Sequence, residues 1–315
     1  MVIDAHSHVG KDYYFNGTTL ESYDDYCTRN NIDAGLLMPM PWPVFEGDDK
    51  EVCSLVWEHQ NYKLINYFKL IKQGDKVVKK KVVSNPYKNV NEYYYNLIKN
   101  TKTNTKINFV PIIHGVLDEA SYVESFIKTA NPIALKFHGF SSGFFKDDVN
   151  PELVEVIKYY DLPIILHTSV YNYDDGYGLD TKFWRNKCSP QNWFKFLFEN
   201  ELRGVLNHGA CLDEKTISLV NKSDNIMIGI GPDLDISLDP YKVLTPKKEY
   251  LKKGYLNILK GLVDPEKLIF DLDFNWNKDN HGNVDCGSVS RVINTWTYSD
   301  SEKILYKNAK NFYKI

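Results

Sequence analysis

Eight short apolar runs, separated by segments of helical character, constrain this sequence more than any other feature. The runs lie at residues 2–8, 34–38, 107–114, 133–138, 163–168, 204–208, 225–230 and 268–274. They are almost continuously apolar, as strands buried on both faces of a parallel sheet are. Strands that alternate with helices form parallel βα units, so the runs predict an α/β fold.

The segments between the runs fit helices. The clearest are 20–30, 119–129, 151–160, 191–199, 213–221, 247–262 and a closing helix at 300–312. Pro151 suits a first helical turn with Asn150 as its cap. Eight units favour a closed (β/α)8 TIM barrel, which takes about 250 residues. An open doubly wound sheet is the alternative, but no GxGxxG turn follows the first run.

The 315 residues therefore predict one domain, 1–315, with long loops after strands 2 and 5. The first, an aromatic-rich insertion at about 41–104, is expected to hold one or two helices and a small hairpin. The second, 170–190, is rich in Tyr, Asp and Gly. Loops after barrel strands form the active-site face, so we expect both to cover the pocket. Alternatively, the insertion forms a contact between the subunits of an oligomer.

The composition limits the kinds of molecule that the chain is expected to bind. The net charge of −3 gives no electrostatic attraction to nucleic acid or to an anionic membrane. The sequence has no run of 18 apolar residues, so no membrane span is predicted. The N-terminus lacks the pattern of a signal peptide, and a cytoplasmic location is therefore expected. Five cysteines without a CxxC pair argue against a disulfide framework. A small-molecule substrate is the expected partner, and a homodimer is compatible with the sequence.

Two histidines, His6 and His8, stand at the end of the first run. Because side chains alternate along a strand, the two imidazoles face the same side. In a barrel that side can be the interior, where both rings reach one ion. Imidazole suits zinc, copper, iron and nickel, so the pair indicates a metal site.

Three further metal-capable residues end other runs. His167 ends the fifth run, His208 the sixth and Asp273 the eighth. The C-terminal ends of barrel strands are where catalytic sites are built. A single histidine of this kind is ordinarily a buried structural residue. Five metal-capable residues at the ends of four strands favour a catalytic metal centre instead.

Five short motifs, in order along the chain, resemble the amidohydrolase superfamily. They are DAHSH at 4–8, LKFH at 135–138, ILH at 165–167, NHG at 207–209 and IFDLDF at 269–274. Residues 304–312 also look like the closing helix of one branch. That branch holds metal-dependent hydrolases and decarboxylases and includes aminocarboxymuconate-semialdehyde decarboxylase. The resemblance spans nearly the whole chain.

The resemblance implies roles for individual residues. His6, His8, His167 and Asp273 would bind the metal, and His208 would orient and deprotonate the attacking water. Asp273 would also shuttle a proton. The chain departs from the branch at the eighth run, where Asp271 and a leucine replace the usual small pair before the aspartate. Since Asp271 and Asp273 face the same way, either can be the ligand, and we prefer Asp273, which is nearer the strand end.

Lys136 leaves the metal count open. In binuclear members of the superfamily a lysine at the end of the fourth strand is carbamylated and bridges two metals, and Lys136 resembles it. The branch described above has Lys-x-His with one metal, which Lys136 and His138 match. The first run starts at residue 2, and we expect no flanking β-sandwich of the kind that many binuclear members have. We therefore expect one divalent ion, zinc first, with a second metal or manganese as alternatives.

Other residues are candidates for contacts with the substrate. Lys136 could hold a substrate carboxylate, and His138 points the same way. His114 ends the third run, where a pocket role and a structural role are equally open. The full set of candidates is Lys136, His138, His114, Tyr171, Trp184 and Arg185.

The chemistry of such a site favours hydrolysis. A divalent metal lowers the pKa of bound water to about 7, and neutral His208 can accept a proton near that pH. The expected substrate is an amide, ester or lactone that can carry a carboxylate. Non-oxidative decarboxylation is the alternative, but decarboxylases of the branch use arginine near the carboxylate and this chain has few arginines. A non-catalytic metal- or ligand-binding barrel is the second alternative.

Overall fold

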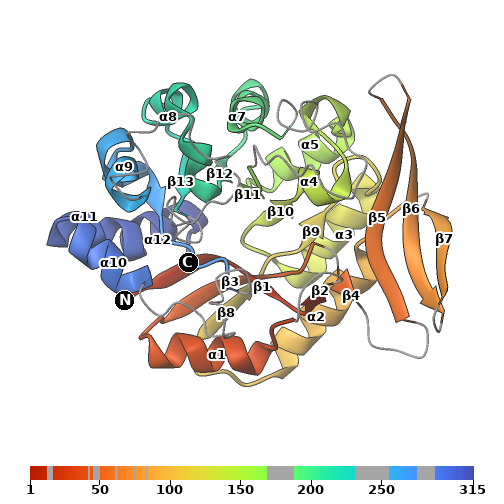
Figure 1. Cartoon of the computed structure of the whole chain (residues 1–315), viewed down its shortest axis with the longest axis horizontal. Helices are drawn as coiled ribbons and strands as arrows, with labels where there is room; N and C mark the ends of the chain where they lie inside the picture. The colour runs from red at the N-terminus through yellow and green to blue at the C-terminus, as the bar shows by residue number, and fades with distance from the viewer. Residues whose placement is uncertain are drawn as a thin grey trace.

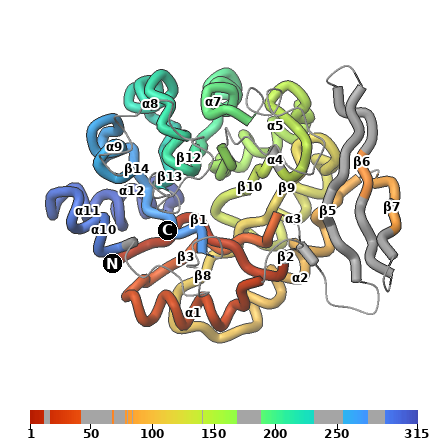
Figure 2. The backbone as a smooth tube through the Cα atoms, in the orientation of Figure 1, coloured from red at the N-terminus to blue at the C-terminus, as the bar shows by residue number. Residues whose placement is uncertain are grey.

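The computed structural model describes the chain with several gaps (Figure 1; Figure 2). The described residues are 1–12, 17–41, 43–44, 50–60, 63–73, 76–82, 84–168, 188–230, 255–274 and 288–315. The candidates Tyr171, Trp184 and Arg185 lie outside the described residues, as does most of the predicted loop at 170–190.

Parallel strands form the centre of the molecule in two sheets. One has the order β1 (Ile3–Val9), β3 (Ala34–Pro39), β8 (Lys106–Phe109). The other runs in the order β9 (Ile112–Ile113), β10 (Leu135–Phe137), β11 (Ile164–Leu166), β12 (Gly204–Leu206), β13 (Ile226–Gly229), β14 (Leu268–Ile269). Each of the eight predicted runs contributes strand residues, and all the ladders of both sheets are parallel.

The two sheets meet at two places. β8 and β9 belong to one predicted run, interrupted next to Pro111, which has no N–H to give to a ladder. Beyond β14, the Ala5 amide donates to the Phe270 carbonyl at 3.0 Å, and the Asp273 amide donates to the His6 carbonyl at 2.7 Å. The described parallel strands nevertheless pair in two sheets and not in one closed barrel.

Helices surround these strands in Figure 1. They are α1 (Leu20–Arg29), α2 (Lys88–Asn100), α3 (Ala120–Ala130), α4 (Gly139–Ser142), α5 (Pro151–Tyr159), α7 (Pro190–Glu199), α8 (Glu214–Val220), α9 (Tyr255–Leu262), α10 (Ser288–Thr295), α11 (Tyr298–Glu302) and α12 (Asn308–Tyr313). A π-helical turn, Lys303–Lys307, joins α11 to α12. The predicted start of α5 is confirmed, since the Asn150 side chain accepts from the Glu152 amide at 3.0 Å. Within the described part, each helix is too short or too polar to cross a bilayer.

Alternate strand residues separate into two apolar clusters. The larger cluster lies between strands and helices and includes Leu37 of β3, Leu206 of β12 and Trp193 of α7. The smaller cluster joins strand residues of both sheets: Ile3, Ala5, Ala34, Leu36, Met38, Val110, Ile165, Val205, Met227 and Ile269. Phe312 and Tyr313 of α12 pack against this inner cluster. Both faces of the strands are thus buried, which explains why the runs read as continuously apolar.

The insertion after β3 folds mainly as a sheet. β2 (Lys11–Asp12), β4 (Pro43–Val44), β5 (Lys50–Gln60), β6 (Lys63–Gln73) and β7 (Lys76–Val82) form an antiparallel five-stranded sheet in the order β2-β4-β5-β6-β7. α2 follows it, so the expected small hairpin is part of a larger sheet and one helix is present. The segment is rich in β-branched and aromatic residues, which favour strands when partner strands are available. Figure 1 shows the sheet beside α4 and α5, and β5 contacts α4.

Candidate metal centre

A β-bulge in β1 sets the direction of its histidines. Between Asp4 and Ser7 the pairing with β3 shifts by one residue, so Ala5 and His6 together stand opposite one residue of β3. A bulge of this kind interrupts strict alternation and re-aims side chains. Ala5 belongs to the inner cluster, and His6 and His8 follow it toward the interior.

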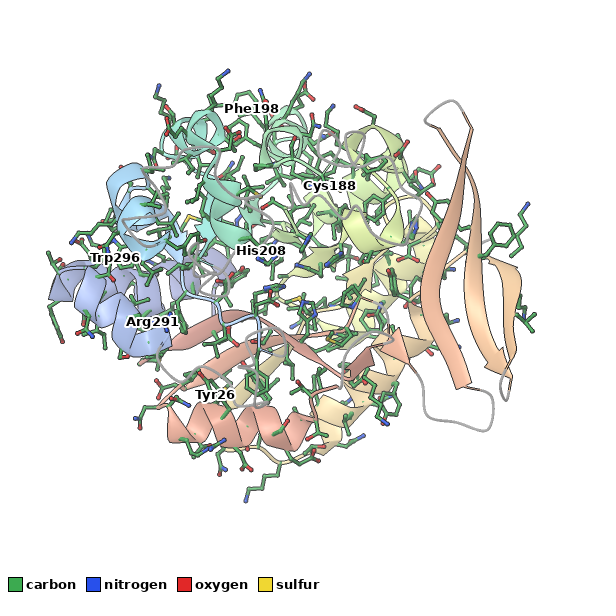
Figure 3. All side chains as sticks on the ribbon, viewed as in Figure 1. Tyr26, Cys188, Phe198, His208, Arg291 and Trp296 are labelled. Carbon is green, nitrogen blue, oxygen red and sulfur yellow. The ribbon has the colours of Figure 1, made fainter. Side chains whose placement is uncertain are left out.

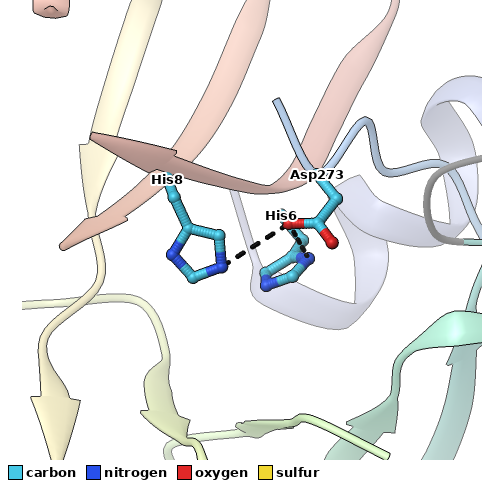
Figure 4. A group of neighbouring side chains, drawn as sticks. All are labelled: His6, His8 and Asp273. Atoms are coloured by element: carbon cyan, nitrogen blue, oxygen red, sulfur yellow. Dashed lines mark ion pairs between the residues drawn. The ribbon is translucent and has the colours of Figure 1, made fainter. Parts of the chain in front are cut away.

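His6, His8 and Asp273 converge in that interior (Figure 4). The Asp273 Oδ1 atom lies 3.7 Å from His6 Nδ1 and 3.5 Å from His8 Nε2. One ligand atom from each residue lies within 4.8 Å of the others. The three side chains are only 1%, 2% and 6% exposed, so the donor atoms face a space shielded from water.

Neighbouring groups orient the two imidazoles. His8 Nδ1 lies 2.9 Å from the Pro39 carbonyl, which can only accept a hydrogen bond, so Nδ1 carries the proton and Nε2 presents its lone pair toward Asp273. A backbone carbonyl behind a histidine is the usual arrangement at metal ligands. His6 Nε2 lies 2.9 Å from Lys136 Nζ, which leaves His6 Nδ1 on the side of Asp273.

The donor set fits a divalent cation. Within the described part of the chain, His6 Nδ1, His208 Nδ1 and Asp273 Oδ1 are buried atoms without a hydrogen-bond partner. Leaving such an atom unsatisfied costs about 1–3 kcal/mol. A cation between His6 and Asp273 would satisfy their two atoms, and imidazole with carboxylate suits zinc or another first-row metal.

A second group of imidazoles adjoins the first. His208 lies near the middle of the molecule, at the end of β12 (Figure 3). Its Nε2 atom lies 3.0 Å from His167 Nδ1, and its Nδ1 atom lies 4.0 Å from Asp273 Oδ2. The His167 ring stacks on His138, with centroids 4.0 Å apart. His167 is thus next to His208 and outside the group of His6, His8 and Asp273, and its role as a ligand stays a prediction.

Comparison with known proteins identifies the fold through structure. No protein-family model matches the chain. No curated protein matches its sequence. A protein from Staphylococcus aureus designated an amidohydrolase has 12% identity and a TM-score of 0.56, covering 100% of this chain and 99% of the other. A protein from Pseudomonas putida designated a 2-pyrone-4,6-dicarboxylic acid hydrolase has 13% identity and a TM-score of 0.57, with coverage of 99% and 97%.

A third solved structure has bound manganese. It is a 5-carboxyvanillate decarboxylase from Novosphingobium aromaticivorans, with 6% identity, a TM-score of 0.61 and coverage of 100% and 97%. The chain has the amidohydrolase fold. The similarity runs over the whole chain at very low identity, so it establishes the architecture, and the chemistry must be argued from the residues.

Burial keeps the histidines in and beside the candidate metal centre neutral. Burial first, and then the nearby Lys136, lower the pKa of His8 and of His208 to about 3. Burial first and then Lys136 also lower the pKa of His6 well below its ordinary value. Neutral imidazole is the form that binds metals, so the site can hold a cation.

Lys136 and Asp273 form an oppositely charged pair in the same interior. Burial lowers the pKa of Lys136 to about 7, while the Asp273 carboxylate acts in the other direction. Burial likewise raises the pKa of Asp273 to about 7, and Lys136 opposes it. Lys136 is fully buried beside His6, on the side away from Asp273. The charge of each group therefore depends on the other.

The structure separates the two aspartates of the eighth run. Asp273 lies in the three-residue group. Asp271 lies beside β13, where a Cβ on Gly229 would collide with its Oδ2 atom. Gly229 thus makes room for Asp271, and the preference for Asp273 as the ligand candidate agrees with this geometry.

His114 has backbone partners at both ring nitrogens. Nδ1 faces the amides of Val116 and Leu117 at 3.2 and 3.1 Å, and Nε2 faces the Ser142 carbonyl at 3.0 Å. The ring also packs edge-on against Tyr67 of β6, 4.9 Å between centroids. These contacts favour the structural alternative for His114. They also attach the insertion sheet near the C-terminal end of β9.

An element that the sequence did not indicate carries His208. Five consecutive residues, His208 to Leu212, have φ between 47° and 59° and form a short left-handed turn after β12. A left-handed conformation costs roughly 1–2 kcal/mol for each non-glycine residue, so tertiary contacts must hold this turn. Gly209 is its only sequence signal, and one glycine after a strand does not predict five left-handed residues.

Proposed function

We propose that the chain is a metal-dependent hydrolase of the amidohydrolase superfamily. The substrate class is a small amide, ester or lactone that carries a carboxylate. One observation carries the proposal: His6, His8 and Asp273 bring three buried ligand atoms within 4.8 Å of one another in an amidohydrolase fold. Sites of this fold class are built at the C-terminal ends of the strands, where β1 and the segment after β14 place these residues.

The proposed cofactor is one divalent ion, zinc first, held by His6, His8 and Asp273 with His167 as the fourth ligand. Such an ion supplies Lewis acidity, which polarises a carbonyl and makes a bound water more acidic. Manganese, or a second metal with a carbamylated Lys136, is the alternative. In the one-metal form the Lys136 ammonium would hold the substrate carboxylate as a compact positive charge.

The proton transfers are assigned to His208 and Asp273. Neutral His208 accepts a proton, and its cationic form is stabilised by the Asp273 carboxylate 4.0 Å away. His208 would hand this proton to Asp273, which would pass it to the leaving group. His138 forms the wall of the site behind His167.

The positions of the arginines favour hydrolysis over decarboxylation. Arg203 pairs with Asp161 at 3.2 Å and lies over the Phe312 ring, with Phe312 packed in the inner cluster at α12. Arg29 lies in the last turn of α1. Neither faces the histidines, whereas Lys136 is a fully buried cation beside His6 that could hold a carboxylate. The same buried Lys136 makes non-oxidative decarboxylation the second candidate.

The proposed architecture is a closed (β/α)8 barrel in which the segments 41–104 and 170–190 cover the metal face. Two observations support it. Backbone hydrogen bonds join β1 to residues 270–274, which is where a closing seam belongs. The insertion sheet contacts His114 through Tyr67, after the end of β9.

Metal content tests the proposal directly. The purified protein is expected to hold one equivalent of zinc by elemental analysis. Asp273→Asn should lose the ion, because it removes a charged ligand. Asp271→Asn, a buried aspartate two residues away, is the matched control and should keep it. Protein that binds no transition metal after growth with added zinc would refute the proposal.

Product analysis separates the two reactions. The zinc-loaded protein is to be screened with esters, lactones and amides that carry a carboxylate, and with aromatic carboxylic acids. Hydrolysis releases acid without CO₂, whereas decarboxylation releases CO₂ and leaves the ester or amide bond intact. We expect turnover only in the first group. Release of CO₂ alone would replace the hydrolase by the decarboxylase.

A further inference from the structure

The geometry points to Asp4 and Ser7 as positioning residues that fix Asp273 for its role in the metal centre. This inference rests on the proposed metal site. Neither side chain belongs to the group of candidate ligands, and both are fully buried. We assign them a joint role because together they bind the backbone on either side of Asp273.

Three consecutive amides of the eighth run donate to β1. The Leu272 amide donates to Asp4 Oδ1 at 2.9 Å, and the Phe274 amide donates to Ser7 Oγ at 3.0 Å. Between them, the Asp273 amide donates to the His6 carbonyl at 2.7 Å. The same stretch of β1 that provides His6 therefore holds the backbone that presents Asp273.

The β-bulge makes this arrangement possible. In a regular strand, residues three apart face opposite sides. The extra residue between Asp4 and Ser7 brings the two side chains onto the same side, where Ser7 Oγ donates to Asp4 Oδ2 at 2.5 Å. The bulge turns His6 toward the interior as well. One backbone irregularity thus sets both the candidate ligands and the support beneath Asp273.

α1 completes the support. The Tyr23 hydroxyl donates to Asp4 Oδ2 at 2.6 Å, and the Tyr23 ring packs edge-on against Phe274 at 5.4 Å. A Cβ on Gly35 of β3 would collide with that hydroxyl, so the neighbouring strand leaves space for it. The Asp4 carboxylate has four donors in all, the fourth being the His6 amide at 3.2 Å. A carboxylate held by four donors cannot turn without breaking several bonds.

The held backbone is one that Asp273 would not adopt by itself. Its φ is +48°, in the left-handed region that non-glycine residues avoid. If the amides on either side were released, the chain could relax toward ordinary extended geometry and the carboxylate would leave His6 and His8. Asp4 and Ser7 therefore act on the metal through Asp273 and not by touching it.

Ser7→Ala is the principal test, because it removes one hydroxyl and leaves every candidate ligand in place. Groups behind metal ligands typically contribute 10–100-fold in metal affinity or activity. We expect the zinc affinity, measured by competition with a chelator, to fall at least tenfold. The visible absorption spectrum of the Co²⁺-loaded variant should also change, because the coordination geometry changes.

Ser301→Ala is the matched control. Ser301 of α11 is equally buried, and its hydroxyl donates to the Val292 carbonyl at 3.4 Å, far along the chain from the site. Both variants lose a buried serine hydroxyl, and Ser7→Ala should lose more thermal stability without metal, because Ser7 makes two hydrogen bonds and Ser301 one. Only Ser7→Ala should change zinc affinity and the Co²⁺ spectrum. Equal zinc affinity in Ser7→Ala and wild type would overturn the inference.

Asp4 gives a second comparison. Asp4→Asn keeps one oxygen for the Leu272 amide, and the Ser7 and Tyr23 hydroxyls can turn to accept from the new amide group. Asp4→Asn should therefore retain more zinc affinity than Asp4→Ala. An Asp4→Asn protein no better than Asp4→Ala would contradict the positioning role. If the wild-type protein binds no metal, the proposed function fails together with this inference. If the wild-type protein binds zinc tightly and Ser7→Ala binds it equally well, only this inference fails.

Discussion

The choice of nitrogen that each imidazole turns toward Asp273 decides what each histidine can do. His8 turns Nε2 to Asp273 because the Pro39 carbonyl takes Nδ1. His208 turns Nδ1 to Asp273 because His167 occupies its Nε2. The first arrangement suits a ligand, and the second suits a group that exchanges a proton with a neighbour.

This difference predicts separate effects for two substitutions. His208→Asn should keep the zinc and lose turnover by roughly 10²–10⁴-fold, the usual contribution of general acid–base catalysis. His6→Asn should lose zinc and turnover together, because it removes a ligand. Metal content and rate are to be measured on the same preparations.

The opposite result has a clear meaning. If His208→Asn loses its zinc as completely as His6→Asn, then His208 is itself a ligand. The two-metal arrangement with a carbamylated Lys136 would then be the better proposal. His114→Asn is a useful reference for the loss of a buried histidine, since the ring nitrogens of His114 face backbone groups and not the candidate metal centre.

At the scale of elements, the left-handed turn after β12 determines where His208 can lie. Gly209 has φ of +56° and sits against α9, where an added Cβ would collide with the Tyr255 hydroxyl. That hydroxyl donates to the Ile230 carbonyl at 2.5 Å, at the end of β13. The turn, α9 and β13 are therefore packed as one unit around a position that only glycine fills.

Two glycine substitutions test this packing. Gly209→Ala should lower the free energy of unfolding by about 1–3 kcal/mol, from the left-handed conformation and the collision with Tyr255. Gly261→Ala, in α9 with nothing near its missing Cβ, should raise it by about 0.5–1 kcal/mol, because alanine favours a helix. Urea unfolding at constant pH measures both. If Gly209→Ala leaves the free energy of unfolding unchanged or raises it, the left-handed turn is wrong.

At the scale of the whole molecule, the buried charges determine how stability depends on pH. Burial lowers the pKa of six histidines: His6, His8, His114, His138, His167 and His208. It raises the pKa of three aspartates: Asp4, Asp118 and Asp273. The two sets act in opposite directions, and the histidines are more numerous.

The metal-free protein should therefore lose stability in mild acid. Between pH 6.5 and about 3 the unfolded chain binds protons at histidines such as His8 and His208, which stay neutral when folded. The stability that these neutral histidines contribute is fully present above pH 6.5 and is lost as the pH falls. Asp273 opposes this, since its folded pKa of about 7 favours protonation in the folded state. Each group that is protonated in only one of the folded and unfolded states changes the free energy of unfolding by up to about 1.4 kcal/mol per pH unit, unless another group compensates for it.

Urea unfolding in the presence of a chelator at pH 7.5, 6.5 and 5.5 checks this expectation. The unfolding midpoint should fall between pH 6.5 and pH 5.5. Zinc-loaded protein is the comparison, and it should unfold at a higher urea concentration at each pH, because an ion that binds the folded state stabilises it. A midpoint that stays constant or rises toward pH 5.5 would show that the aspartates outweigh the histidines.

Local sequence determined the parallel βα pattern and the positions of the candidate metal residues. Continuous apolar runs predict doubly buried strands, and His6 and His8 had to face one side because strand side chains alternate. Their relation to Asp273, 265 residues later, was predicted only through the rule that barrel strands present their C-terminal ends on one face. Alternation also could not decide between Asp271 and Asp273, because it sends both the same way.

Tertiary structure decided the features that depend on partners distant in sequence. The bulge between Asp4 and Ser7 exists only through the pairing of β1 with β3. The positive φ of Asp273 is held by hydrogen bonds to β1, and the insertion became a sheet because its strands found antiparallel partners. Local propensity cannot show such choices, since each costs free energy locally and is repaid only by contacts made across the fold.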